Sequence, residues 1–203
     1  MTLLIPVILA QMLASPAPSD SPARPARGSV ETLRADLDGD HLEDTLRLEQ
    51  RRTGVYLVLE MSNGRKIEKG LGIEPLTFSL DGVSSRLALR DIDGDGAPEI
   101  LVGAAVGDRG MLFVLSYDAS AEVAPLRSLR SGDEAFVADR GAGADAIRIS
   151  SKGVIDVATL RAAKNGTRLT RDQFQWSADA HDFVWSDSVA SATATPFAGF
   201  RSE

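Results

Sequence analysis

The feature that most constrains this fold is a pair of acidic segments that recur 55 residues apart, residues 36–44 and 91–99. Each contains glycine and several aspartates, which favour turns, and each leads directly into an apolar run. Counted from Asp36 and from Asp91, acidic residues occupy positions 1, 3, 5 and 9 of both segments. A turn that opens into a short apolar run predicts a β-strand after each segment, in a fold built from repeated β units.

The rest of the chain shows the same strand-like pattern. Asn63-Gly64 separates residues 53–60 from residues 65–69, which predicts a hairpin. Residues 132–139 form the one segment with a helical pattern. We therefore expect an all-β fold of antiparallel sheets with about ten short strands, arranged as propeller-blade-like repeats or as a small sandwich. The other expected strands cover residues 86–90, 100–102, 111–115, 146–150, 153–160, 173–176 and 183–185.

Composition shifts divide the chain into four parts. Residues 1–14 form an apolar stretch that is too short to cross a bilayer and predicts a signal peptide, although a buried first strand or a misassigned start would give the same pattern. Residues 15–28 are rich in proline and alanine and are expected to be a linker. The folded domain should cover residues 29–188, and residues 189–203 should form a flexible tail. The predicted location is secreted or periplasmic.

Composition also restricts the function classes. The chain has no cysteine and only two histidines, which excludes thiolate chemistry and disfavours a histidine-rich metal site or a hydrolytic triad. A net charge of −7 disfavours a nucleic-acid partner. The mature chain should not span a membrane. No phosphate-binding or nucleophile-elbow motif is present in the sequence.

The spacing of the acidic residues matches the needs of calcium, which binds six to eight oxygens at about 2.3–2.6 Å. Carboxylates at positions 1, 3 and 5 converge if the chain curls around the ion, a carbonyl at position 7 joins them, and the acid at position 9 closes the site. Two acidic surface turns without a metal are the alternative. The candidate Ca²⁺ ligands are Asp36, Asp38, Asp40, Leu42, Asp44, Asp91, Asp93, Asp95, Ala97 and Glu99.

Position 6 distinguishes the two segments. This position needs a left-handed backbone, which Gly96 accepts freely and His41 accepts less readily. The second segment is therefore expected to bind its ion more tightly. An EF-hand is excluded because position 12, which would need a bidentate Glu, is Arg47 in one segment and Val102 in the other.

The pattern Asp-x-Asp-Gly-Asp-Gly-x-x-Glu before an apolar strand resembles the FG-GAP/VCBS repeats of integrin-alpha-type β-propellers. The resemblance implies that Asp91, Asp93, Asp95 and Glu99 are calcium ligands, and the first segment follows it except at His41. The 55-residue offset is close to one propeller blade. A third copy, without its upstream acidic residues, would end at residues 145–147. So few repeats cannot close a propeller of four to eight blades, which favours a compact single domain.

Two functional hypotheses follow. The first is a non-catalytic interaction or adhesion module that Ca²⁺ stabilises and that meets a protein or glycan surface. The second is a small secreted hydrolase with a catalytic metal, which would need an open coordination position. Trp176 and Trp185 could stack on a sugar or complete a hydrophobic core.

Overall fold

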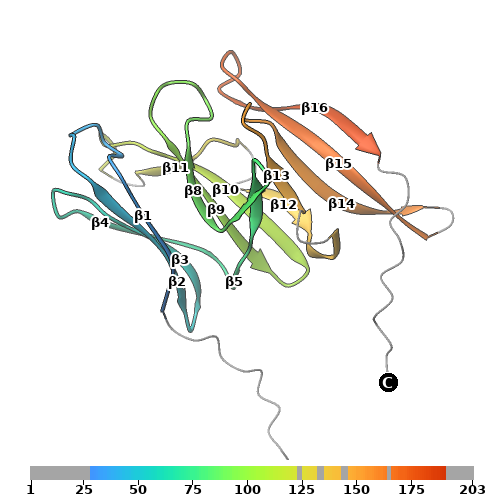
Figure 1. The fold of residues 1–203 in the computed structure, drawn as a ribbon, viewed down its shortest axis with the longest axis horizontal. Helices are drawn as coiled ribbons and strands as arrows, with labels where there is room; N and C mark the ends of the chain where they lie inside the picture. Colours follow the sequence, from blue (N-terminus) through green and yellow to red (C-terminus); the bar gives the residue numbers. More distant parts are fainter. Residues whose placement is uncertain (1–27, 123–124, 132–134, 143–145, 164–165, 191–203) are drawn as a thin grey trace, which may run out of the picture.

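The protein is an all-β structure of three antiparallel sheets (Figure 1). The computed structural model describes residues 28–122, 125–131, 135–142, 146–163 and 166–190. The expected signal peptide, nearly all of the expected linker and most of the expected tail lie outside these ranges. Within them there is no α-helix, and one short 3₁₀ turn covers Arg140–Ala142. In this part of the chain, no helix has the length and apolar character needed to cross a membrane.

Sheet A is a four-stranded meander formed by the first quarter of the folded chain. Its second strand alternates strictly, with Leu46, Leu48 and Gln50 buried and the residues between them partly exposed. This period of two places one face of the sheet in the core. The Asn63-Gly64 turn joins the last two strands, so the predicted hairpin is confirmed. The strands are β1 (Gly28–Ala35), β2 (Asp44–Arg51), β3 (Gly54–Glu60) and β4 (Lys66–Gly72).

Sheet B lies in the middle and is also built on a four-stranded meander. Its two long strands, β9 and β10, pair with each other in the centre. On one side β5 and β8 pair with different parts of β9, and on the other side β11 and β12 pair with different parts of β10. Its strands are β5 (Glu74–Pro75), β8 (Leu87–Arg90), β9 (Glu99–Val106), β10 (Arg109–Tyr117), β11 (Leu126–Ser128) and β12 (Phe136–Asp139).

Sheet C is the third meander, with a two-stranded hairpin added to its edge. The pairing of β6 with β13 is parallel, and all other pairings in the three sheets are antiparallel. The predicted closing hairpin of β15 and β16 is confirmed. The strands are β6 (Phe78–Leu80), β7 (Val83–Ser85), β13 (Ile147–Ile149), β14 (Ile155–Ala163), β15 (Gly166–Ser177) and β16 (Asp182–Ala190).

Two hydrophobic cores hold the sheets together, one on each face of sheet B. Along β9, Ile100 and Val102 pack toward sheet A, whereas Leu101 packs toward sheet C. Along β10, Phe113 and Val114 divide in the same way. Burial on both faces explains why these two strands read as continuous apolar runs rather than as alternating ones.

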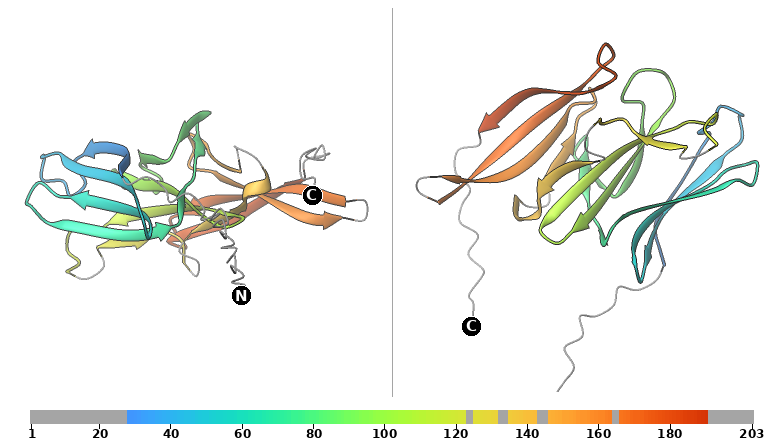
Figure 2. Two further views of the ribbon diagram at one scale, coloured as in Figure 1. Left: turned by 90° about the horizontal axis from the view of Figure 1, so that it is seen from below. Right: turned by 180° about the vertical axis from the view of Figure 1, so that it is seen from behind.

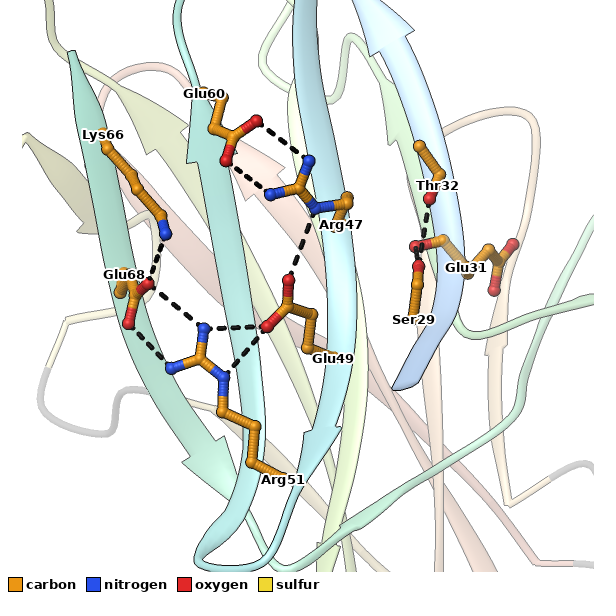
Figure 3. A network of polar contacts seen from close by, with 9 residues as sticks. All are labelled: Ser29, Glu31, Thr32, Arg47, Glu49, Arg51, Glu60, Lys66 and Glu68. Atoms are coloured by element: carbon orange, nitrogen blue, oxygen red, sulfur yellow. Dashed lines mark hydrogen bonds and ion pairs between the residues drawn. The ribbon is translucent and has the colours of Figure 1, made fainter. Parts of the chain in front are cut away.

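The three meanders stand next to one another like consecutive blades, and they are not closed into a barrel (Figure 2). The outer face of sheet A, which is turned away from sheet B, carries a ladder of ion pairs (Figure 3). Arg47 pairs with Glu60 and Glu49, and Arg51 pairs with Glu49 and Glu68. This face is therefore polar, and its charges are matched within the sheet.

Three sequence-based expectations differ from the structure. The helix expected at residues 132–139 is wrong, because Phe136–Asp139 is β12 and pairs with Arg109–Leu112 of β10. Phe136 and Ala138 are buried while Val137 is exposed, so the period of two prevails over local helix propensity. Sixteen strand segments occur in the described residues, more than the ten expected, because several contain only two or three residues. The last strand also continues to Ala190, two residues into the expected tail.

Candidate metal centre

Both acidic segments connect neighbouring antiparallel strands at the same place in their sheets. Loop 1 (residues 36–43) joins β1 to β2, with Ala35 paired to Asp44 across its base. Loop 2 (residues 91–98) joins β8 to β9, with Arg90 paired to Glu99. The acid at position 9 is therefore the first residue of the strand that follows each loop, as the sequence predicts.

The two loops share one hydrogen-bond frame. In each, the carboxylates at positions 1, 3 and 5 accept backbone amides two or three residues further along the chain, which curls the loop around its own acidic side chains. The donors and acceptors are Gly39 to Asp36 (2.7 Å), Gly94 to Asp91 (2.8 Å), Asp40 to Asp38 (3.2 Å), Asp95 to Asp93 (3.0 Å), and Leu42 to Asp40 and Ala97 to Asp95 (2.8 Å each). The amides of Leu42 and Ala97 thus belong to the frame, and their carbonyls stay predicted ligands.

The acid at position 9 completes the hydrogen-bond frame of each loop. It is the shorter aspartate in loop 1 and the longer glutamate in loop 2. Asp44 is fully buried, and its two oxygens accept the amides of Leu37 (2.9 Å) and Ser62 (2.8 Å). Glu99 is also buried and accepts the amide of Ile92 (2.7 Å). The Asp44 carboxylate accepts backbone amides on both oxygens, whereas the longer Glu99 also places an oxygen within 4.8 Å of oxygens of Asp91 and Asp93.

Position 6 has the left-handed backbone that the sequence predicts. The φ angle is 66° at His41 and 92° at Gly96. The His41 amide donates to Asp36 Oδ2 at 2.9 Å, while its imidazole is 95% exposed, with Nδ1 at 3.7 Å from the same oxygen. His41 therefore adopts the conformation of the glycine it replaces, with a strain that Gly96 avoids.

Three carboxylates converge in each loop closely enough to share one ion. Oxygens that bind one calcium at about 2.4 Å lie at most about 5 Å apart. In each loop one oxygen from each of three acids lies within 4.8 Å of the other two. The converging sets are Asp36, Asp38 and Asp40 in loop 1, and Asp91, Asp93 and Glu99 in loop 2. Asp44 and Asp95 are in neither set, and their oxygens are placed by the amides described above.

Bringing these acids together disfavours their charged forms, as their pKa values show. Burial, followed by the charges of neighbouring carboxylates, raises the pKa of Asp38 and of Asp93 against the hydrogen bonds that lower it. Burial raises the pKa of Glu99 to about 7, and the charge of Asp93 adds to this. A divalent cation between these groups would reverse both effects, because it favours the charged form of each carboxyl.

Ser62 is a site residue that the sequence pattern does not reveal. It lies in the β3–β4 turn, where its hydroxyl donates to Asp40 Oδ2 at 2.7 Å and its amide donates to Asp44. The Ser62 hydroxyl is the main reason that the pKa of Asp40 is lowered. Loop 1 is therefore supported by a second chain segment 18 residues beyond Asp44, and only a prediction of the β2–β3–β4 pairing could have placed Ser62 there.

The same turn also reaches sheet B. Arg65 donates to the carbonyls of Ala121 (2.9 Å) and Glu122 (3.2 Å), in the connection after β10. In sheet C, residues 150–154 join β13 to β14 by a tight turn in place of a long acidic loop. The expected third copy at residues 145–147 stays a prediction, because residue 145 lies outside the described ranges; Ile147 is the first residue of β13.

Comparison with known proteins gives no relative for this chain. No protein-family model, no curated protein and no solved structure matches it. The two loops themselves are therefore the basis for proposing a function.

Proposed function

We propose that this protein is a calcium-binding module in which Ca²⁺ occupies both loops and stabilises sheets A and B. The observation that carries the proposal is the duplicated geometry: two loops 55 residues apart share the same hydrogen-bond frame and gather three carboxylates each. Surface turns that arose independently have no reason to repeat this arrangement, whereas two sites for one hard cation require it.

The module would act by surface contact rather than by catalysis, outside the cytoplasm. Calcium sites of extracellular modules typically have dissociation constants of about 10⁻⁴–10⁻³ M, which suits a compartment with millimolar calcium. Export can be tested by N-terminal sequencing of the protein from its native host. The mature chain should begin between residues 15 and 29, and a retained Met1 in a cytosolic fraction would contradict export.

Thermal unfolding tests the calcium proposal. A ligand that binds only the folded state adds about 1.4 kcal/mol at ten times its dissociation constant, so the melting temperature should rise between chelator and millimolar calcium. The double variant Asp38→Ala/Asp93→Ala removes a converging carboxylate from each loop and should lose this rise. Magnesium at the same concentration is the control for ionic strength, and an equal rise with magnesium would argue against a specific site.

A further inference from the structure

Each acidic loop places one apolar side chain in the core between its own sheet and the next sheet. At position 2 of loop 1, Leu37 is 6% exposed and belongs to the core shared by sheets A and B. Ile92 has the equivalent position in loop 2, is 8% exposed, and belongs to the core shared by sheets B and C. The two loops therefore lie at different interfaces between sheets, although their hydrogen-bond frames match.

The acid at position 9 connects each of these core residues to the frame of its loop. The buried carboxylate of Asp44 accepts the Leu37 amide at 2.9 Å, and the buried carboxylate of Glu99 accepts the Ile92 amide at 2.7 Å. A movement of either carboxylate would therefore also move a residue whose side chain fills the core. Protein cores are close-packed and tolerate such displacements poorly. The position of the acids and the packing between sheets are thus linked.

Loop 1 has a second connection across the interface between sheets A and B. It runs through the β3–β4 turn, where the Ser62 hydroxyl donates to Asp40 at 2.7 Å. The Met61 amide closes this turn by donating to the carbonyl of Arg65 at 2.9 Å. The Arg65 guanidinium in turn donates to the carbonyl of Ala121 at 2.9 Å, in the connection that follows β10 of sheet B. One short turn therefore joins an acid of loop 1 to sheet B.

Loop 2 has its own connections across the interface between sheets B and C. Arg90, the residue before the loop, pairs with Asp81 in the β6–β7 turn of sheet C. The Asp81 amide donates to the carbonyl of Ile149 in β13 at 2.9 Å. A β-carbon added at Gly153 would lie 3.5 Å from the carbonyl oxygen of Ile92, so the β13–β14 turn lies directly against the loop. These contacts join loop 2 to sheet C.

We propose that each loop controls one interface: a cation in loop 1 stabilises the packing of sheet A on sheet B, and a cation in loop 2 stabilises the packing of sheet B on sheet C. This role rests on the proposed calcium binding and specifies where in the molecule the binding energy acts. Proteins open locally as well as globally, and a ligand opposes only those openings that release it. Each ion should therefore oppose the opening of the interface at which its loop lies.

The middle sheet provides a matched pair of probes for the two interfaces. Val102 of β9 is buried in the core shared with sheet A, and Val114 of β10 is buried in the core shared with sheet C. The chain has no cysteine, so Val102→Cys and Val114→Cys each introduce a single thiol. A buried cysteine behaves as a small hydrophobic residue, which suits both positions. Such a thiol reacts with a labelling reagent only when its interface opens, so the labelling rate reports that opening.

Thiol labelling of the full chain, in chelator and in calcium at ten times the weaker dissociation constant, tests this role. The reagent would be dilute enough that the interface recloses faster than the thiol reacts. We expect calcium to slow the labelling of both thiols by at least about tenfold, because opening must release the ion. Asp38→Ala, in loop 1, should abolish the slowing for Val102→Cys and leave it for Val114→Cys. Asp93→Ala, at the same position of loop 2, should do the reverse and is the matched control.

A loop variant that changes the labelling of both thiols equally would overturn the assignment of one interface to each loop, because the three sheets would then open as one unit. Calcium that binds in calorimetry but slows neither thiol would also overturn it, and would leave the proposed calcium binding intact. If calorimetry of the same variants shows no bound calcium, the proposed function itself fails, and the control of the interfaces fails with it.

Discussion

The buried carboxyl of Glu99 should make the stability of the calcium-free protein fall as the pH rises. Burial raises its folded-state pKa from 4.5 to about 7. Between these values the folded protein binds a proton that the unfolded chain releases. The contribution is therefore fully present below pH 4.5 and is lost as the pH rises through 7. A pKa shift of this size corresponds to about 3 kcal/mol in the free energy of unfolding.

The isosteric variant Glu99→Gln isolates this effect. Its amide resembles the protonated acid in shape and can still accept the amide of Ile92 through its carbonyl oxygen. In chelator, we expect equal stability of variant and wild type at pH 4.5, and a variant that is more stable by up to about 3 kcal/mol at pH 8. Urea denaturation at the two pH values measures both differences.

Calcium should reduce the advantage of the variant at pH 8. With millimolar calcium at pH 8, the wild type gains the binding energy of loop 2, and Glu99→Gln does not. If wild type and variant keep the same stability difference at pH 4.5 and pH 8 in chelator, Glu99 does not have the raised pKa. If calcium then stabilises both equally, Glu99 is not a ligand either.

Three further predictions concern neighbouring features. His41→Gly should stabilise the protein in chelator by about 1–2 kcal/mol, because the left-handed strain is already present in the metal-free loop; unchanged urea denaturation would refute this. Ser62→Ala should weaken calcium binding at loop 1 and leave loop 2 unchanged in a chelator-competition titration, since Ser62 holds Asp40; equal losses at both loops would contradict that role. Glu68, whose pKa Arg51 lowers to about 2, should contribute stability above pH 4.5 that is lost as the pH falls toward 2. When stability is measured as the pH is lowered, Glu68→Gln should not show this loss. A pH dependence of stability identical to that of the wild type would count against the ion pair.

Much of the fold follows from local sequence pattern. The Asn63-Gly64 hairpin combines a turn dipeptide with β-branched flanks, and both signals are local. The two acidic loops were also placed correctly before their strands, because position 9 marks the point where the apolar pattern begins. The left-handed backbone at His41 was predictable from its equivalence to Gly96.

The parts that sequence reasoning missed depend on contacts between distant segments. Residues 136–139 form a strand because β10 is available as a partner, which no local signal reveals. Ser62 supports loop 1 only because the meander of sheet A brings its turn beside Asp40. The different roles of Asp44 and Glu99 depend on one methylene group and on a second amide, that of Ser62, which is present at loop 1.

The direct test of the central claim is the number of calcium ions bound by the full chain at pH 7.5, measured by isothermal titration calorimetry. Two ions per chain are predicted, with the tighter one lost in Asp93→Ala and the weaker one lost in Asp38→Ala. Binding of no calcium at millimolar concentration would contradict the account, and so would two ions that remain bound in the Asp38→Ala/Asp93→Ala double variant.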